Sequence, residues 1–392
     1  MINFRKFFNY PIYEVGGCVR DSILGLPIKD TDIASDLPPE EFKKLCKKLG
    51  CKTHDTGIDH GTVTVIIDGE CYEHTTFRKD VSCDGRNATI EFSKTIEEDL
   101  SRRDFTINAI AKLGDEIIDP FHGQEDLKNR KLKTVGDAEE RFSEDYLRIV
   151  RAARFISRLK LKADSKLVKA ANKLSCRIIK HVSIERISDE IKKAQKHAKD
   201  FFIEAEALGF LFEIFPEASQ LSSEEKNSWL NHIQNAESKD EVLYFAAILI
   251  PLFGKEAEKK AAFLRMSGHI SKGTGILYKT RPLFSENISP SSLRDLMIEA
   301  KVYYEDAKEF FCEISNNTED SRLVIKRIES FENKVKESIQ SPFIKGEYLI
   351  QAGLKPSPAF KSILDDCGRL QAEGKDYAEV ESYAKSRIDS LK

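Results

Sequence analysis

The period of hydrophobic and polar positions changes about one third of the way along the chain. Before about residue 130, short runs rich in β-branched and aromatic residues are typical of strands. Asp68-Gly69 separates two such runs and predicts a tight hairpin turn. Helical periods at residues 19–24 and 39–49 accompany the runs, so this part predicts a small α/β domain. Its strands are expected at residues 12–15, 31–34, 62–67 and 71–77.

From about Leu132 onward, strand signals nearly disappear and one helical period follows another. Proline interrupts a helix, so prolines divide this part into separate helices. With no internal repeat or low-complexity linker, the pattern predicts an all-helical remainder of about three modules. We expect breaks at Pro216, Pro251, Pro282, Pro290 and Pro342.

Composition excludes some classes of protein. The 392 residues are enough for several domains and a sizeable core. A net charge of −3 argues against a globally basic nucleic-acid binder, so any such contact must come from local patches. No apolar run is long enough to span a bilayer, and the N-terminus lacks the features of a signal peptide. The eight cysteines are scattered without C-x-x-C, which predicts neither zinc nor a disulfide framework and favours the cytosol.

Two carboxylates stand one residue apart near the N-terminus. Asp30 and Asp32 share one face of a strand, where like charges are costly unless a cation lies between them. Carboxylates together with substrate phosphates suit Mg²⁺. Upstream, Gly16-Gly17 and Arg20 predict a strand, a turn close to a phosphate, and a helix start. A Gly-Gly turn alone also fits an ordinary strand–helix connection, but the whole set predicts a nucleotide site.

The next polar positions allow two interpretations each. Glu73 is either a third carboxylate near the metal or an exposed strand residue. Residues 78–92 are polar, include a glycine, and are too long for a tight hairpin, which predicts a loop. That loop is either functional or a plain surface connection.

Residues 97–111 predict a helix with one apolar side. Asp104 and Asn108 are then an i,i+4 pair on its polar side, beside Arg102 and Arg103. An arginine near a metal site can hold a triphosphate through two hydrogen bonds. The alternative is a solvated, charged helix.

Residues 144–155 predict another helix, which carries arginines every three residues. Arg148, Arg151 and Arg154 lack acids at i+4, so they repel one another unless an anion or distant acids compensate them. Asp145 lies three residues before Arg148, the first of these arginines. An acceptor beside a donor matches the Watson–Crick edges of cytosine and adenine, which present an amino group beside a ring nitrogen. The Asp145–Arg148 pair therefore fits C and A, and disfavours G and U.

With these residues in view, the chain resembles the class II tRNA nucleotidyltransferase and poly(A) polymerase family, and is most similar to bacterial CCA-adding enzymes. The resemblance covers most of residues 12–194, and residues 345–364 are more distantly similar to the tail of those enzymes. The matching segments are GGCVRD (16–21), KDTDIAS (29–35), RKDVSCDGRNATIEF (78–92), EEDLSRRDFTINAIA (97–111), DPFHGQEDL (119–127), EDYLRIVRAARF (144–155) and SIERISDEIKKA (183–194).

The resemblance implies catalytic and triphosphate-binding residues. Asp30 and Asp32 are the catalytic carboxylates and bind two Mg²⁺ ions. Gly17, Arg20 and Arg103 lie on the triphosphate side of the incoming nucleotide.

It also implies residues for the base and ribose. Asp145 and Arg148 read the base, and Arg151 and Arg154 help to hold the nucleotide. The segment linked to ribose recognition supplies two supporting residues, Asp104 and Asn108. Residues 78–92 correspond to the flexible loop associated with the change from C to A addition.

The implied fold is an α+β, polymerase-β-like nucleotidyltransferase head with a small mixed sheet, followed by an all-α neck, body and tail. The implied activity is template-independent addition of CMP, CMP and AMP to the tRNA 3′ end, with CTP, ATP and the tRNA acceptor arm as partners and no membrane. Alternatives are A addition only, a bacterial poly(A) polymerase, or an RNA-binding module with an inactive head; the chain is expected as a monomer or homodimer. The expected domains are a catalytic head (1–131), a neck that recognises the nucleotide (132–195), a body (196–300) and a tRNA-binding tail (301–392).

Overall fold

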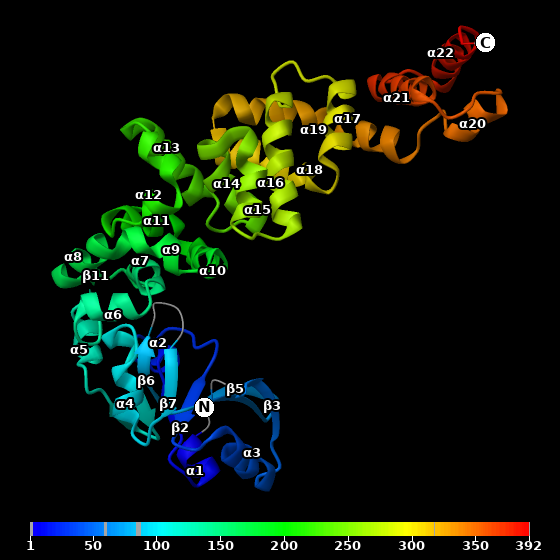
Figure 1. Ribbon diagram of the computed structural model, residues 1–392. Coiled ribbons are helices and arrows are strands. Elements are labelled where there is room, and N and C mark those ends of the chain that lie inside the picture. Colours follow the sequence, from blue (N-terminus) through cyan, green and yellow to red (C-terminus); the bar gives the residue numbers. More distant parts are fainter. Residues whose placement is uncertain (1–2, 59–60, 84–87, 317, 392) are drawn as a thin grey trace. The chain divides into compact units, whose positions relative to one another are not determined.

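The computed structural model describes residues 3–58, 61–83, 88–316 and 318–391. These residues fall into two compact units, Met1–Gln220 and Leu221–Lys392. In the described part of the chain, strands occur in the first unit alone (Figure 1). The division between the units lies inside the expected body, and the four-part division stays a prediction.

A seven-stranded mixed sheet forms the centre of the first unit, which confirms the expected fold class. The strands are β1 (Tyr13–Val15), β2 (Asp32–Ser35), β3 (Lys52–Gly57), β4 (Thr62–Ile67), β5 (Glu70–Thr76), β8 (Ala111–Leu113) and β9 (Glu116–Ile118). Their order is β3-β4-β5-β2-β1-β8-β9. Only β2 and β5 run parallel, and the other neighbouring pairs are antiparallel.

Four of these strands match the sequence prediction, and three were missed. The turn between β4 and β5 is confirmed, because Asp68 and Gly69 have φ values of 52° and 87°. Strand β3 is polar and mostly exposed at the sheet edge, so it shows no apolar alternation. Strands β8 and β9 have three residues each, too few to establish a period.

The prediction that residues 78–92 form a loop is wrong. They contain a second hairpin, in which β6 (Arg78–Cys83) pairs antiparallel with β7 (Ala88–Phe92). The register shifts between Asp80 and Ser82, and this irregularity hides the alternation of a regular strand. Residues 84–87 lie outside the described residues.

Alternation along β2 fixes which face carries the site. Ile33 packs into a core with Phe42 of α3 (Pro39–Lys48). Ala34 packs on the other side with Leu100 of α4 (Ile96–Ser101). Asp32 is two residues before Ala34 and therefore lies on the α4 side of the sheet.

On the α3 side of the sheet, a buried histidine of β5 contacts both β2 and α3. His74 of β5 is opposite Ile33 in the register, and its ring stacks on Phe42 with centroids 3.6 Å apart. Its Nε2 and Ser35 Oγ form a hydrogen bond of 2.8 Å. Burial lowers the pKa of His74 to about 3, so this histidine is neutral at physiological pH.

Helices make up the rest of the first unit. Helix α7 (Leu147–Leu159) packs against α10 (Ile184–Ala194) and α11 (Ala198–Ala207). Among the described residues that follow β9, the strands are β10 (Lys131–Leu132) and β11 (Lys162–Ala163), which form a short parallel pair. The remaining helices are α1 (Phe4–Phe8), α2 (Gly17–Ile23), α5 (Gly123–Lys128), α6 (Ala138–Glu144), α8 (Ser165–Leu174), α9 (Ile178–His181) and α12 (Leu211–Ile214), with short 3₁₀ turns between several of them.

The second unit is helical, as expected. The predicted break at Pro251 is wrong, because α14 continues past it to Phe253. Pro251 removes only the hydrogen bond from its own position to the preceding turn, and the helix continues beyond it to Phe253. Trp229 Nε1 donates a hydrogen bond of 3.0 Å to Ile248 O of this buried helix. The helices are α13 (Ser223–Asn235), α14 (Glu241–Phe253), α15 (Ala257–Phe263), α16 (Gly268–Thr280), α17 (Pro290–Ala300), α18 (Tyr304–Glu309), α19 (Glu319–Gln340), α20 (Gly346–Gln351), α21 (Pro358–Glu373) and α22 (Tyr377–Asp389).

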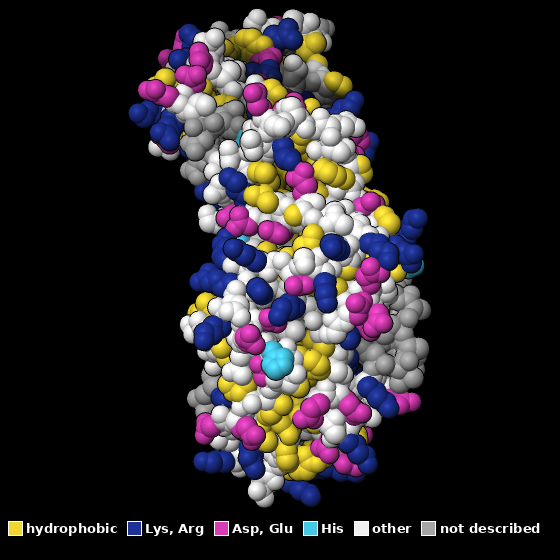
Figure 2. All heavy atoms as spheres, turned by 90° about the vertical axis from the view of Figure 1, so that its left-hand side faces the viewer, with side chains coloured by type: hydrophobic (Ala, Val, Ile, Leu, Met, Phe, Trp, Pro, Cys, Tyr) yellow, Lys and Arg dark blue, Asp and Glu magenta, His cyan; other side chains and the backbone are white. Residues whose placement is uncertain are grey.

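Charged side chains of both signs cover the face drawn in Figure 2, where Lys and Arg are interspersed with Asp and Glu. This mixture agrees with the net charge of −3. Among the described residues, none of the helices is long and apolar enough to cross a membrane. On this face, binding of an anion must therefore depend on local sites rather than on one basic surface.

Gly69→Ala tests the predicted hairpin turn. Gly69 has φ +87°, and no atom lies within 4 Å of the position its Cβ would take, so alanine adds backbone strain without a clash. We expect the free energy of unfolding of the first unit to fall by about 1 kcal/mol, measured by urea unfolding with circular dichroism. Gly57→Ala is the control, because Gly57 lies in the same sheet without a positive φ. Equal losses in the two variants would contradict the turn.

Candidate active site

The acidic side of the candidate site lies where β2 and β5 run parallel. Asp32 and Glu73 are register partners, and both line a cavity of about 550 Å³. Burial and then the charge of Asp32 raise the pKa of Glu73. Burial raises the pKa of Asp32 against the opposing effect of Arg103, and Asp30 raises it further. Asp30 is exposed and is not among the cavity-lining residues.

These carboxylates fit a divalent cation only in part. In the described residues, no group of three or more His, Cys, Asp or Glu side chains converges to hold a metal by itself. The structure instead provides a few carboxylates with raised pKa values, next to an open cavity. This donor set matches an ion that one or two carboxylates share with substrate phosphates.

The Gly-Gly turn brings the backbone against an arginine. Gly16 has φ +73°, and a Cβ there would lie 2.6 Å from Arg103 Nη1. Its N–H donates a hydrogen bond of 3.0 Å to Ile110 O. Gly17 begins α2, and the nearest atom to its hypothetical Cβ is 3.7 Å away. The requirement for glycine is therefore at Gly16, while both residues line the cavity.

Arg20 lies in the cavity wall with its guanidinium already hydrogen-bonded. Its Nε donates to Asp21 Oδ1 at 2.8 Å, and its Nη1 donates to Asn108 Oδ1 at 2.5 Å. Arg158 donates to the other carboxylate oxygen of Asp21 at 2.8 Å. Burial lowers the pKa of Arg20. The side chain is thus fixed in direction before any ligand binds.

The prediction of one helix over residues 97–111 is wrong. Helix α4 ends at Ser101, and a separate 3₁₀ turn covers Thr106–Asn108. Asp104 accepts a hydrogen bond from the Phe105 N–H at 2.9 Å, an alternative to continuing the helix. The expected pair still meets, because Asn108 Nδ2 donates to Asp104 Oδ1 at 3.0 Å.

Asp99, which the sequence interpretation overlooked, holds two arginines of the site. Arg102 Nη2 donates to its Oδ1 at 2.8 Å, and Arg103 Nη2 donates to its Oδ2 at 3.1 Å. Burial alone would raise the pKa of Asp99, but Arg103 and Arg102 outweigh it and hold that pKa below its usual value. The i,i+3 and i,i+4 spacing was the signal available in the sequence.

The prediction of a continuous helix over residues 144–155 is also wrong. Helix α6 ends at Glu144, and Asp145 is extended, with φ −151° and ψ 104°. The Leu147 N–H donates to Asp145 Oδ1 at 3.1 Å, so Asp145 interrupts the first helix and accepts a hydrogen bond from the first residue of α7. Its Oδ2 accepts from Arg186 at 2.7 Å.

Arg148 is oriented by contacts other than Asp145. Its Nη1 donates to Glu144 Oε2 at 2.5 Å, and its Nη2 donates to Arg102 O at 3.1 Å. Arg148 and Asp145 nevertheless line the same cavity. The structure therefore brings the expected acceptor and donor to one site, each held by its own partners.

The other arginines of α7 have acidic partners from distant segments. Arg151 pairs with Asp104 at 2.8 Å, and Arg154 donates to Glu190 of α10 at 2.5 Å. Burial acts to raise the pKa of Asp104, but Arg151 and hydrogen bonds outweigh it and hold that pKa low. The guanidiniums of both arginines also lie over the Phe155 ring, 5.4 Å and 4.4 Å from its centroid.

The complete cavity wall is strongly cationic. Its lining includes nine arginines and four carboxylates. The carboxylates are Asp32, Glu73, Asp104 and Asp145. The arginines are Arg20, Arg78, Arg102, Arg103, Arg148, Arg151, Arg154, Arg158 and Arg186. An excess of positive charge beside an acidic edge suits a polyphosphate held together with a cation.

Comparison with known proteins agrees with this arrangement. Residues 12–133 match the family model of the poly A polymerase head domain. These residues therefore resemble a poly A polymerase head domain. The match agrees, over residues 12–133, with the expected resemblance to the class II tRNA nucleotidyltransferase and poly(A) polymerase family.

Known relatives extend the match beyond the head domain. A CCA-adding enzyme of Listeria monocytogenes is 43% identical over 212 residues, which cover 52% of each chain. The match thus spans about half the length of this curated relative.

Two solved structures resemble almost the whole chain. The CCA-adding enzyme of Bacillus stearothermophilus in complex with CTP has a TM-score of 0.75 and 27% identity, covering 98% of this chain and 96% of that chain. The Thermotoga maritima CCA-adding enzyme complexed with tRNA has a TM-score of 0.67 and 21% identity, covering 100% and 93%, and supports the fold alone.

Asp99→Asn tests the buried support of the head domain's arginines. The folded-state pKa of Asp99 is lowered, so its stabilising effect is present above the unfolded pKa of about 3.9 and is lost as the pH falls through the folded pKa. We expect the variant to lose about 3 kcal/mol of unfolding free energy at neutral pH, with a smaller difference from wild type below about pH 4. Urea unfolding at several pH values measures both effects.

Glu98→Gln is the matched control, because Glu98 is exposed on the same helix. Its unfolding free energy should stay near that of wild type at every pH. A loss in Asp99→Asn that does not depend on pH would contradict the ionised state assigned to Asp99.

Proposed function

We propose that this chain is a CCA-adding nucleotidyltransferase, which transfers CMP, CMP and AMP without a template to the 3′ end of a tRNA, using CTP and ATP. The observation that carries the proposal is the arginine-lined cavity of the first unit. There an acidic strand edge, an arginine-rich wall and the Asp145–Arg148 pair line one space. The matches to CCA-adding enzymes support the same activity.

Asp30 and Asp32 would hold Mg²⁺, with Glu73 as a supporting carboxylate. Burial first, and then a neighbouring carboxylate, raise the pKa values of Asp32 and Glu73, and a bound cation would offset both effects. When bound, Mg²⁺ would supply charge neutralisation at the triphosphate and favour deprotonation of the attacking 3′-hydroxyl. The chain's own side chains would bind the triphosphate, orient it and recognise the base.

The arginine wall would bind and orient the triphosphate. Arg103 is adjacent to the Gly16 backbone, and Arg20 is held from behind by Asp21 and Asn108. Fixed guanidiniums align the α-phosphate with the RNA hydroxyl without having to reorganise during the reaction. Gly17 allows the backbone to approach the nucleotide at the start of α2.

Helix α7 and the residues before it would recognise the nucleoside. Asp145 accepts from, and Arg148 donates to, the edge of cytosine or adenine. Arg151 and Arg154 hold the nucleotide, and Arg151 is positioned by Asp104, which Asn108 also contacts. Asp104 and Asn108 would be the supporting residues on the ribose side of the site.

The other proposed properties follow from this activity. The proposed acceptor is the 3′ end and acceptor arm of a tRNA. The Thermotoga maritima CCA-adding enzyme, which has a similar fold, was solved in complex with tRNA. We place the reaction in the cytosol. The buried free thiols of Cys18, Cys46 and Cys367 are compatible with a reducing compartment.

The deciding experiment uses tRNA transcripts that end before CCA, after C, and after CC, each with CTP and ATP separately. The proposal predicts C addition to the first two and A addition to the third. Addition of A to the third transcript alone would favour an A-adding enzyme, and long A tails would favour a poly(A) polymerase. Binding of tRNA without incorporation would favour an inactive head.

Asp32→Ala tests the metal-binding carboxylate. We expect incorporation to fall by about a thousandfold, because several kcal/mol of charge stabilisation disappear, while tRNA affinity in a filter-binding assay stays near that of wild type. Glu70→Ala is the control, because Glu70 is exposed on the same strand as Glu73. Robust turnover by Asp32→Ala would refute the assignment.

Asp145→Ala tests base recognition. We expect the preference in kcat/KM for CTP and ATP over UTP and GTP to fall by about tenfold, since one base-reading acceptor is lost. Glu140→Ala, at an exposed position of α6, should keep the preference. An unchanged preference in Asp145→Ala would exclude the role proposed for Asp145.

A further inference from the structure

Three arginines in the wall of the active-site cavity converge on one aromatic ring. Phe155 of α7 is 4% exposed and lines this cavity. The guanidinium carbons of Arg154, Arg20 and Arg151 lie 4.4, 5.2 and 5.4 Å from the centroid of its ring. Each distance is within the range over which an aromatic ring attracts a cation. One side chain therefore interacts with three cations of the site.

The cations around this ring come from two separate helices. Arg151 and Arg154 precede Phe155 on α7, whereas Arg20 belongs to α2. Helix spacing therefore does not account for the contact with Arg20. The ring of Phe105 packs at 77° to that of Phe155, with the centroids 5.7 Å apart. Because both rings are buried, this packing restricts rotation of the Phe155 ring and fixes the face that it presents to the arginines.

The guanidiniums repel one another where they meet. Burial is the main cause that lowers the pKa of Arg20, and Arg154 lowers it further. Burial also lowers the pKa of Arg154, and Arg151 adds to this effect. Acids offset part of the repulsion, because Asp21 pairs with Arg20 and Glu190 pairs with Arg154. The aromatic ring is a further attraction, shared by all three cations.

A carboxylate and an aromatic ring stabilise a cation in different ways. A carboxylate neutralises the charge and occupies N–H donors of the guanidinium. The ring attracts the cation through its quadrupole and carries no net charge. The N–H donors of a guanidinium lie in its plane, so a group that covers its face leaves them available for phosphate oxygens. The ring can thus hold the arginines together while the wall stays cationic.

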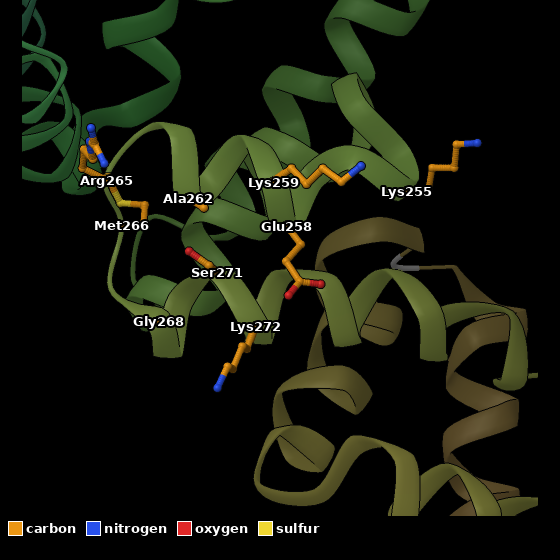
Figure 3. Close-up of a pocket in the computed structure, with 9 residues that line it drawn as sticks. All are labelled: Lys255, Glu258, Lys259, Ala262, Arg265, Met266, Gly268, Ser271 and Lys272. Carbon is orange, nitrogen blue, oxygen red and sulfur yellow. The ribbon is translucent and has the colours of Figure 1, made fainter.

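The cavity between α15 and α16 in the second unit shows a different arrangement of cations. This cavity measures about 680 Å³. In Figure 3, Lys255 and Lys259 project on one side and Arg265 lies on the other, while Lys272 extends from α16. Among the described residues that line it, none is aromatic. Convergence on one ring is therefore not a general property of the cationic surfaces of this chain.

We propose that Phe155 is a positioning residue for the incoming nucleotide, whose ring holds three guanidiniums at the spacing that a triphosphate requires. This inference rests on the proposed function for the identity of the ligand. It adds a role for an apolar side chain, which acts through Arg20, Arg151 and Arg154. Because these arginines are on the phosphate side of the proposed site, the ring has the same effect on CTP and ATP.

The test weakens the attraction between ring and cations with little change in ring size. Mono-, di- and trifluorinated phenylalanine, introduced at Phe155 of the full chain, withdraw electron density from the ring face stepwise. Calorimetric titration without tRNA measures the affinities for CTP, ATP and inorganic triphosphate, so no transfer occurs. We expect all three affinities to fall stepwise, by about tenfold for the trifluorinated ring. Guanidiniums that have moved apart must be ordered again when the ligand binds.

Phe142 is the matched control, because it is fully buried on α6 and, in the described part of the chain, no cation lies over its ring. The same fluorinated series at Phe142 should keep the wild-type affinities. Phe155→Leu retains an apolar side chain without a π face, and we expect it to lose about as much affinity as the trifluorinated ring. Circular dichroism and urea unfolding verify the fold of every variant.

The outcomes separate this inference from the proposed activity. If wild type binds CTP without extending tRNA and the series shows the stepwise loss, the activity fails and the role of Phe155 stands. If wild type extends tRNA but the fluorinated series binds all three ligands like wild type, the role of Phe155 is wrong and the activity stands. Weak binding by Phe155→Leu alone would then be a packing effect.

Two further results would also overturn the role of Phe155. A loss confined to CTP or to ATP would place the ring at the base instead of at the phosphates. Affinities that rise with fluorination would show that the ring competes with the triphosphate for the arginines. A wild type that binds none of the three ligands would overturn both the role of Phe155 and the proposed activity.

Discussion

Buried carboxylates behind the arginines are the constraint on which the head depends. Guanidiniums gathered around one cavity repel one another, and the repulsion grows as water is excluded. Asp99 pairs with Arg102 and Arg103, while Glu190 pairs with Arg154. Each acid comes from behind the wall, so it neutralises part of the charge without filling the cavity. The wall remains cationic on the cavity side, and the buried acids reduce the repulsion that would otherwise destabilise the fold.

These pairs also determine how the segments of the first unit fit together. Glu190 belongs to α10 and Arg154 to α7, so their ion pair holds two helices at one spacing. Arg151 joins α7 to the segment that contains Asp104. Losing a single buried partner would leave an uncompensated charge, which costs more than the pair contributes. The arginine-rich cavity wall is therefore organised by ion pairs with acids such as Glu190 that do not line the cavity.

The sequence predicted the parts of the site that depend on local spacing. The strand edge with Asp32, the Gly-Gly turn and the hairpin at Asp68-Gly69 follow from adjacent residues, and the structure has them. Continuous helices were predicted wrongly around Asp104 and Asp145, because their side chains bond nearby backbone N–H groups. The acidic partners of Arg151 and Arg154 are tens of residues away, and no local period reveals them. The resemblance covers the segment that contains Arg186 and Glu190, but it implies no role for either residue.

The break at Asp145 shows why such local failures matter for function. In a continuous helix, Asp145 and Arg148 would lie one turn apart, and helix geometry alone would set the directions of their side chains. In the structure, Asp145 is extended and held by Arg186, while Arg148 is held by Glu144 and Arg102 O. An acceptor and a donor fixed independently can match two base edges of different size more readily than a rigid helical pair. Breaking the helix therefore separates the placement of the two groups, as the proposed recognition of both cytosine and adenine would require.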